Sequence, residues 1–205
     1  MITIIDYGMG NLGSIQNMFK YLEIESKIEN DPDKIKNASK ILLPGVGSFD
    51  TAMKKINESD LKEVLNEKAL KEQVPVLGIC LGMQLLTNCS EEGKFEGLGW
   101  VDAQTINFKD KIDKKLKIPH MGWNIVNKSN DSLLTKDFET FDEVRFYFVH
   151  SYFVKVEDEK NSILKTKYGI EFDSAIQKDN IYGAQFHPEK SHKFGMKLFE
   201  NFARM

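Results

Sequence analysis

Short apolar runs alternate with amphipathic segments through the first half of the chain, and this feature most restricts its fold. The apolar runs are short enough for single buried strands and cover residues 1–7, 24–28, 39–43 and 75–79. Apolar residues recur at helical spacing in the segments 12–22, 49–56, 60–70 and 81–89. Such alternation is typical of βαβ units, so it predicts an α/β fold with a parallel sheet covered by helices.

The second half of the chain has a different pattern. Runs rich in aromatic residues, typical of strands, cover residues 99–108, 123–126, 144–156, 163–168 and 172–186. A last amphipathic helix is expected at 194–203. We therefore expect antiparallel or mixed strands to extend the parallel sheet. Neither a repeat nor a low-complexity linker interrupts the chain, which predicts one domain over residues 1–205.

Composition argues against several classes of protein. With 41% hydrophobic residues and a net charge of −3, the 205-residue chain is expected to build a full core. No apolar run approaches the roughly 20 residues that span a bilayer. The N-terminal run lacks the basic start of a signal peptide and soon meets Asp6. Two cysteines are too few for a disulfide scaffold and fit a reducing cytosol, so we expect a cytoplasmic protein with no membrane partner.

The basic residues do not form a nucleic-acid-binding stripe. The 28 lysines and arginines are spread along the chain, and only Arg145 and Arg204 are arginines. An arginine clamp for phosphate groups is therefore not expected, and neither is a nucleic-acid partner. The composition favours an enzyme or an enzyme subunit.

Two of three glycine-marked turns have more than one interpretation. Residues 8–13 fit the G-x-G-x-x-G pattern of dinucleotide-binding folds, but a tight turn between a strand and a helix needs the same glycines. Residues 44–48 follow a buried strand and place backbone N–H groups at the start of a helix. Such a turn either stabilises an oxyanion or is a plain helix entry.

The third turn, Gly78-Ile79-Cys80-Leu81-Gly82, decides the chemistry. It is a nucleophile elbow of the type G-x-S-x-G with cysteine in place of serine, between an apolar strand and a helix. The helix N-terminus favours the thiolate form of Cys80. The Leu81 N–H is expected to be one oxyanion donor, with the second donor in the 44–47 turn. Cys89 is expected on the far side of the same helix, in the core and unable to pair with Cys80.

A cysteine nucleophile needs a base, and His187 has the most informative context of the four histidines. Pro188 holds His187 in an extended conformation, in which Glu189 points the same way and orients the imidazole. A Cys80–His187–Glu189 triad is the resulting hypothesis. The histidines and cysteines do not occur at metal-ligand spacing, so neither a metal nor a cofactor is expected.

These segments together resemble the class I, triad-type glutamine amidotransferases over essentially the whole chain. GICLGMQLL at 78–86 and QFHPEKS at 185–191 carry the active-site resemblance. Four further segments resemble the glutaminase subunits of imidazole glycerol phosphate synthase: DYGMGN at 6–11, PGVGSFD at 44–50, PHMGWN at 119–124 and YFVHSY at 147–152. The resemblance implies a three-layer, flavodoxin-like fold with a central, mostly parallel sheet extended by antiparallel strands.

The resemblance also implies an activity and a set of site residues. Such subunits hydrolyse L-glutamine to glutamate and ammonia, which a (β/α)₈-barrel cyclase subunit uses to make imidazole glycerol phosphate and AICAR in histidine biosynthesis. The glutaminase is nearly silent until the partner's nucleotide ligand binds. The implied oxyanion residues are Leu81, Val46 and Gly47. The implied glutamine-binding residues are Gly47, Gln84, His150, Ser151 and Tyr152. The implied contacts with the partner in a heterodimer are Asn11, Trp123 and Lys190.

Three alternatives stay open. The segments at 118–124 and 189–196 and the stretch Asn17-Met18-Phe19 also resemble a paralogous branch that supplies ammonia to sugar-modifying synthases for surface polysaccharide or flagellin glycans. The same triad would also serve a stand-alone cysteine hydrolase. The first glycine turn would serve a non-catalytic dinucleotide-binding module.

Overall fold

The computed structural model describes all 205 residues, and its central feature is one large mixed sheet. The strand order is β2-β1-β3-β4-β13-β12-β10-β6-β5. The first four of these strands and β13 run parallel, and β12, β10 and β6 continue the sheet in antiparallel fashion. This arrangement confirms the predicted α/β fold with a mostly parallel sheet extended by antiparallel strands.

The parallel half follows the order of the first half of the chain. Its strands are β1 Ile2–Ile5, β2 Ser26–Glu29, β3 Ile41–Leu43 and β4 Val76–Ile79. The connecting helices are α1 Leu12–Tyr21, α2 Pro32–Ile35, α3 Phe49–Asn57, α4 Leu61–Asn66 and α5 Leu81–Leu85. A π-helical turn, Glu67–Lys71, continues α4.

The second half supplies the antiparallel strands and a small second sheet. The strands are β5 Cys89–Ser90, β6 Ala103–Asn107, β7 His120–Ile125, β8 Asn127–Lys128, β9 Arg145–His150, β10 Tyr152–Val156, β11 Ser162–Tyr168, β12 Ile170–Lys178 and β13 Ile181–Ala184. β7 and β9 pair with each other as a separate two-stranded sheet. Short 3₁₀ turns occur at Leu133–Thr135, Phe138–Thr140, Glu159–Asn161 and Pro188–Lys190, and α6 is His192–Arg204.

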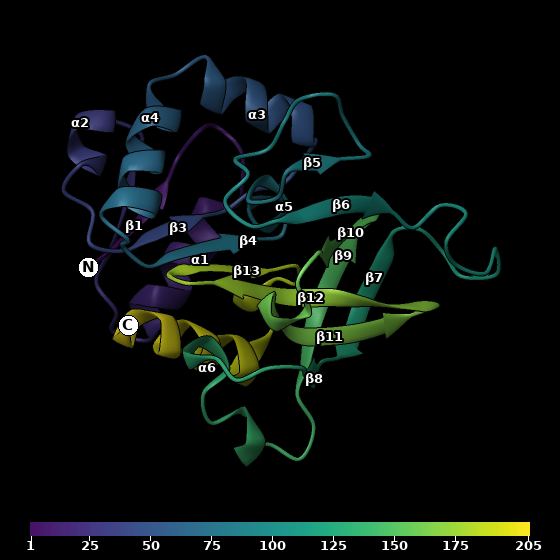
Figure 1. Cartoon of the computed structure of the whole chain (residues 1–205). Coiled ribbons are helices and arrows are strands. Elements are labelled where there is room, and N and C mark those ends of the chain that lie inside the picture. Colours follow the sequence, from purple (N-terminus) through teal and green to yellow (C-terminus); the bar gives the residue numbers. More distant parts are fainter.

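Helices cover both faces of the large sheet, so the fold has three layers (Figure 1). On one side α3, α4 and α5 bury an apolar cluster, and on the other α1 and α6 bury a second cluster. Successive strand residues alternate between the two: Ile4 belongs to the α1/α6 cluster, whereas Ile5 belongs to the α3/α4/α5 cluster. This alternation is the period of two that a strand buried on both faces requires.

Several predicted elements differ from the structure in their bounds. The expected helix at 81–89 ends at Leu85, because the chain turns back to bring Leu98 N–H onto the Leu85 carbonyl. The predicted position of Cys89 in the core of that helix is therefore wrong, and Cys89 is an exposed residue of β5. Both cysteines are free, as expected. The expected runs 144–156 and 172–186 each contain two strands, and α2 lies in a segment where no helix was predicted.

None of the helices is both long and apolar enough to cross a membrane.

The carboxyl ends of β4 and β13 lie side by side in the sheet, with Ala184 paired to Ile79. Residues that follow these two strands are thereby brought together at one edge, which is where ligands bind in open parallel sheets.

Candidate active site

Cys80 occupies a strained turn between β4 and α5. Its backbone has φ 54° and ψ −110°, a conformation that L-residues rarely adopt, and its exposed fraction is 8%. The flanking glycines make the turn sterically feasible. A Cβ on Gly82 would overlap the Leu43 carbonyl oxygen, and a Cβ on Gly78 would lie 2.6 Å from the Gly82 oxygen. The turn thus has the close packing and the strain of a nucleophile elbow.

His187 and Glu189 follow β13 and are bonded to each other. The His187 Nδ1 atom lies 2.8 Å from Glu189 Oε1, and both side chains are almost fully buried. The His187 N–H donates to the Tyr147 carbonyl at 2.9 Å, which fixes the extended backbone before Pro188. His187 Nε2 has no hydrogen-bond partner within the chain, so it is free to exchange a proton with a bound molecule.

The charges around His187 favour its protonated form. Burial alone would lower the pKa of His187, but its interaction with the Cys80 sulfur and its hydrogen bond to Glu189 outweigh burial and raise this pKa to about 10. Protonated His187 therefore places a positive charge beside the Cys80 sulfur and carries a proton that it can donate.

A pocket of about 360 Å³ lies in front of Cys80 and contains most of the residues predicted from the sequence. It is lined by Val46, Gly47, Cys80, Leu81, Gln84, Glu92, Pro119, Val149, His150, Ser151, Tyr152, His187 and Lys190. Glu189 lies behind His187, outside this lining. Asn11 and Trp123, which were expected to contact a partner, also lie outside the pocket.

The turn after β3 lines the pocket and contains backbone N–H groups without a partner. Neither Val46 nor Gly47 donates a backbone hydrogen bond within the chain, and Gly47 has a φ of 108° that favours glycine. As the first residue of α5, Leu81 has an N–H for which the helix offers no carbonyl. Tyr7 Oη donates to the Pro44 carbonyl at 2.5 Å and anchors the start of the turn. The three predicted oxyanion residues therefore lie around one cavity.

The predicted glutamine-binding residues divide into two groups. Gln84, Ser151 and Tyr152 line the pocket with polar atoms, and the Gln84 amide nitrogen lies 3.5 Å from the Tyr152 carbonyl. The His150 imidazole has both nitrogens engaged: Nε2 contacts His120 Nδ1 at 2.8 Å, and Nδ1 contacts the Tyr152 carbonyl at 2.6 Å. Only the backbone of His150 is therefore available to contact a ligand.

His120 and His150 form the middle of a buried hydrogen-bonded chain with a defined direction. Asn124 Nδ2 donates to the Lys167 carbonyl and lies 3.1 Å from His120 Nε2, so that His120 accepts at this atom. His120 Nδ1–H then donates to His150 Nε2, and His150 Nδ1–H donates to the Tyr152 carbonyl. Burial lowers the pKa of His120 to about 4 and that of His150 to about 3, so both imidazoles are neutral.

The two buried neutral histidines, His120 and His150, predict that the protein loses stability at mildly acidic pH. Both native pKa values lie below the ordinary 6.5 of histidine, so the unfolded chain binds protons first as the pH falls, and protonation favours unfolding. The stabilisation is fully present above pH 6.5. We expect the free energy of unfolding to fall between pH 6.5 and 5 by about 2 kcal/mol per pH unit, about 1 from each histidine, measured by urea unfolding at several pH values.

Two variants test the assignment of this slope. His150→Leu removes one of the two buried histidines and is expected to reduce the slope of the pH dependence by about half, whatever its effect on stability at pH 7. His192→Gln is the matched control, because His192 is exposed, and it should keep the slope of the unmodified chain. An unchanged slope in His150→Leu would contradict the interpretation.

Glu92 is a pocket residue that sequence reasoning missed. It is the only carboxylate in the pocket lining, and its Oε2 accepts from the Phe49 N–H at 2.8 Å. The residue lies in an irregular segment after β5 with no motif around it. No sequence signal could have selected it, since only the fold brings it beside the turn at 44–47.

An exposed apolar face lies next to the pocket. Along β7 the side chains of Met121, Trp123 and Ile125 are 61%, 43% and 41% exposed, while the alternate residues face inward. Trp123 stacks on His192 with ring planes 4° apart. Lys190 Nζ lies 5.8 Å from the ring of Tyr147, which pairs with Trp123 across the small sheet. Two of the three predicted partner contacts, Trp123 and Lys190, therefore adjoin the same face.

The third predicted contact, Asn11, lies in a turn that packs beside the turn after β3. Asn11 is exposed, and its side chain accepts from the Ser14 N–H at 3.4 Å as the N-cap of α1. The preceding Gly10 packs near Pro44, which places the 8–11 turn beside the turn at 44–47. Gly8 and Gly10, both with positive φ, are thus accounted for by a tight strand-to-helix connection.

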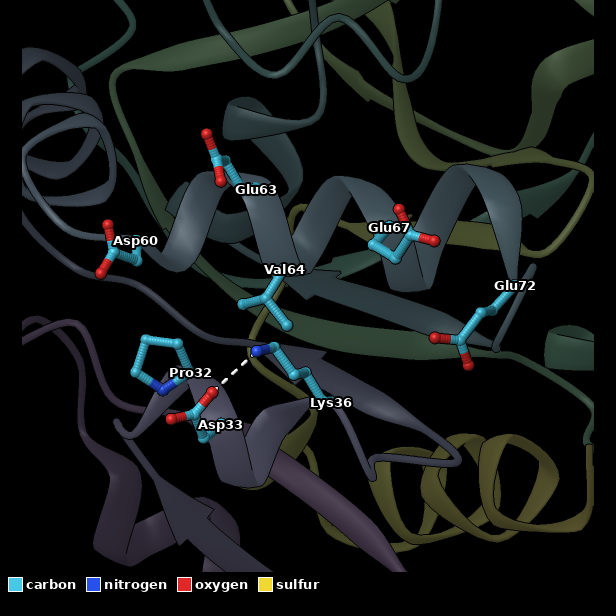
Figure 2. Close-up of a pocket in the computed structure, with 8 residues that line it drawn as sticks. All are labelled: Pro32, Asp33, Lys36, Asp60, Glu63, Val64, Glu67 and Glu72. Atoms are coloured by element: carbon cyan, nitrogen blue, oxygen red, sulfur yellow. Dashed lines mark hydrogen bonds and ion pairs between the residues drawn. The ribbon is translucent and has the colours of Figure 1, made fainter.

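A larger cavity, of about 690 Å³, lies away from Cys80 between α2 and α4. Figure 2 shows its charged lining, in which Lys36 is bonded to Asp33 at 2.7 Å. Glu63 lies on α4, and Asp60 and Glu67 lie at the two ends of that helix. The lining contains neither a nucleophile nor a histidine. No cluster of three or more histidine, cysteine or acidic side chains in the chain is arranged to hold a metal ion. The pocket at Cys80 is therefore the candidate active site.

Comparison with known proteins identifies relatives of the whole chain. The family model described as glutamine amidotransferase class-I matches residues 3–205. The chain is 56% identical to "Imidazole glycerol phosphate synthase subunit HisH 2" of Methanococcus maripaludis, over all of this chain and 99% of that protein. It is 46% identical to "Imidazole glycerol phosphate synthase subunit HisH" of Bdellovibrio bacteriovorus and 43% identical to "Imidazole glycerol phosphate synthase subunit HisH 2" of Pseudomonas aeruginosa, each over the full length of both chains.

Solved structures show the same fold at low sequence identity. One, titled "Structure of PurLQS from Thermotoga maritima", is similar with a TM-score of 0.77 and 18% identity, over 99% of this chain and 97% of that one. Another, titled "Crystal structure of glutamine amidotransferase", has a TM-score of 0.74 at 15% identity, over 100% and 98% of the two chains. At these identities the likeness supports the three-layer fold alone.

Proposed function

Because the chain belongs to the class I glutamine amidotransferases, and within them to the HisH subunits of imidazole glycerol phosphate synthase, we propose that it is the glutaminase subunit of such a synthase. Its role is to hydrolyse L-glutamine to glutamate and ammonia in the cytoplasm for histidine biosynthesis. The observation that carries this proposal is the strained Cys80 facing a pocket together with the free Nε2 of His187. We further propose that residues 1–205 form a single glutaminase domain.

The first half of the reaction forms a thioester. The Cys80 thiolate attacks the side-chain amide carbon of glutamine, and the N–H groups of Leu81 and of the Val46–Gly47 segment stabilise the negative oxygen. Protonated His187 donates its Nε2 proton to the leaving nitrogen, so that ammonia departs as the C–N bond breaks. Glu189 keeps the imidazole oriented through Nδ1.

The second half releases glutamate and restores the enzyme. Neutral His187 takes a proton from water, and the resulting hydroxide attacks the γ-glutamyl thioester. The C–S bond breaks when the tetrahedral intermediate collapses, and the thiolate–imidazolium pair is regenerated. No metal or cofactor takes part in either half.

The pocket has groups for the other end of the substrate. Glu92 supplies a carboxylate for the α-ammonium group of glutamine, and Gln84, Ser151 and Tyr152 supply polar atoms nearby. His150 holds the Tyr152 carbonyl in place from behind.

Replacing Glu92 by glutamine tests the ammonium contact. Glu92→Gln keeps an oxygen for the Phe49 N–H but removes the charge, so we expect KM for glutamine to rise about tenfold while kcat changes by less than about threefold. Steady-state glutamate release measures both constants. Glu91→Gln, one residue away and outside the pocket lining, is the matched control. A change confined to kcat would assign Glu92 another role.

The apolar face of β7 supports a partner subunit at the mouth of the pocket. Val149, paired with Met121 across the small sheet, lines the pocket, so the exposed face is continuous with its rim. Exposed apolar residues gathered in this way mark an interaction surface. We propose that a (β/α)₈-barrel synthase subunit covers it through Trp123, Lys190 and the Asn11 turn, and receives ammonia there without exposure to bulk water.

A second candidate function concerns the acceptor of the ammonia. The relatives from Methanococcus maripaludis and Pseudomonas aeruginosa both carry the number 2 in their names, which distinguishes at least two such subunits in those organisms. One subunit of such a pair is available to feed a different synthase, such as a sugar-amidating one. The triad is the same for either acceptor.

The deciding experiment measures glutamate formation by the chain mixed with the histidine-pathway barrel subunit of the same organism, with and without the partner's nucleotide ligand. Strong ligand-dependent stimulation supports the histidine-pathway assignment. Absence of stimulation, in a sample whose Cys80 still reacts with a glutamine-like electrophile, favours the second candidate. Glutamate formation at full rate without any partner would favour a stand-alone hydrolase.

A further inference from the structure

Gln185 is a buried amide beside the reacting sulfur that the proposed chemistry does not use. Its exposed fraction is 0%, and its Nε2 lies 3.8 Å from Cys80 Sγ, within the range for a hydrogen bond to sulfur. The backbone holds this approach in place. The Cys80 N–H donates to the Ala184 carbonyl at 2.7 Å, and the Gln185 N–H donates to the Ser174 carbonyl at 2.9 Å.

The direction of the Gln185 amide is determined by its neighbours. Gln84 Nε2 contacts both the Tyr152 carbonyl, at 3.5 Å, and Gln185 Oε1, at 3.1 Å. A backbone carbonyl only accepts, so the atom of Gln84 that faces Tyr152 must be the amide nitrogen. Gln185 therefore presents its oxygen to Gln84 and its amide N–H to Cys80.

We propose, on the basis of the function inferred above, that Gln185 is a second stabiliser of the Cys80 thiolate and positions Gln84 at the same time. An N–H that donates to the charged form of a thiol favours that form, and burial strengthens the effect. By accepting from Gln84 Nε2, Gln185 leaves Gln84 Oε1 free to face the glutamine pocket. One buried side chain thus links the nucleophile to the substrate-binding amide.

An amide is suited to this role because it neither gains nor loses a proton during the reaction. His187 gives its Nε2 proton to ammonia during the first half of the reaction and so ceases to be a cation beside the sulfur. The amide N–H stays in place through the cycle. It is available again when the C–S bond breaks and the sulfur regains its negative charge.

Two variants separate the two roles of Gln185. Gln185→Met has nearly the same length but lacks both the N–H for Cys80 and the oxygen for Gln84. Gln185→Glu keeps an oxygen for Gln84 and places a carboxylate against the sulfur. We expect iodoacetamide to alkylate Cys80 at pH 7 about fivefold more slowly in the first variant, and at least about twentyfold more slowly in the second. We expect KM for glutamine to rise in the first variant only.

The pH profile of alkylation distinguishes this role from a structural one. Loss of a thiolate stabiliser moves the profile toward higher pH, whereas a folding defect lowers the reactive fraction at every pH without moving the profile. Gln104→Glu, an exposed glutamine on β6, is the matched control and should give the unmodified profile. Other titratable or charged side chains near Cys80 are the same in all variants: Tyr7, Glu92, Tyr152, His187, Glu189 and Lys190.

The proposal is overturned if both variants fold and their alkylation profiles coincide with that of the unmodified chain. Should the charged variant not fold, Gln185→Met carries the test alone, since it buries no new charge. Alkylation needs neither glutamine nor a partner. A chain that forms no glutamate would contradict the proposed function and still report whether Gln185 acts on Cys80.

Discussion

Replacing Cys80 by alanine is expected to abolish glutamine hydrolysis, with a loss of at least about 10⁴-fold in kcat/KM. The proposed covalent step has no other nucleophile, because Cys80 is the only cysteine in the pocket and no serine or threonine there is bonded to His187. Glutamate release in the presence of the partner and its ligand measures the loss.

The fold is expected to survive this substitution. Alanine removes a single sulfur atom that borders the pocket, and the strained backbone at Cys80 is held by the Ala184 carbonyl and by the glycines on either side. Circular dichroism and partner binding should therefore be unchanged. Cys89→Ala, which alters the exposed cysteine of β5, is the matched control and should keep full activity. Turnover that persists in Cys80→Ala would end the assignment of the nucleophile.

The features that could be predicted from the sequence are those that depend on local chemistry. Gly78 and Gly82 predict the elbow because only glycine fits where a Cβ would meet the backbone of a neighbouring residue. Pro188 predicts the extended conformation of His187, which the structure shows. Most of the parallel half of the sheet could be predicted as well, since β1, β3 and β4 are almost entirely apolar and α1 and α3 each bury one apolar face.

The features that could not be predicted depend on contacts between distant segments. The sequence placed Cys89 wrongly because apolar residues continue at helical spacing past Leu85. In the structure, contacts with the returning chain end α5 at Leu85. Glu92 reaches the pocket from a segment without a motif, and the contact of Gln185 with Cys80 joins residues 105 positions apart. The inward direction of the His150 imidazole depends on His120, thirty residues earlier. Tertiary hydrogen bonds of this kind leave no pattern in the sequence.

The two remaining members of the triad are expected to differ in the size of their effects. His187→Ala removes the group that protonates ammonia and later activates water, so we expect a loss of at least about 10³-fold in kcat. Glu189→Gln keeps an oxygen for His187 Nδ1 but removes the charge that stabilises the imidazolium, and we expect a loss of about 10- to 100-fold. Glutamate release measures both variants, with the exposed Glu157→Gln as control.

The order of these losses follows from where the two side chains lie. His187 lines the pocket with Nε2 unpartnered, whereas Glu189 lies behind the imidazole and does not line the pocket. Glu189 therefore acts only through His187. Its removal should also slow alkylation of Cys80 at neutral pH, because a less stabilised imidazolium supports the thiolate less well. Equal losses in the two variants, or a larger loss in Glu189→Gln, would mean that the carboxylate takes a proton itself, and the distinct roles of base and orienter would have to be abandoned.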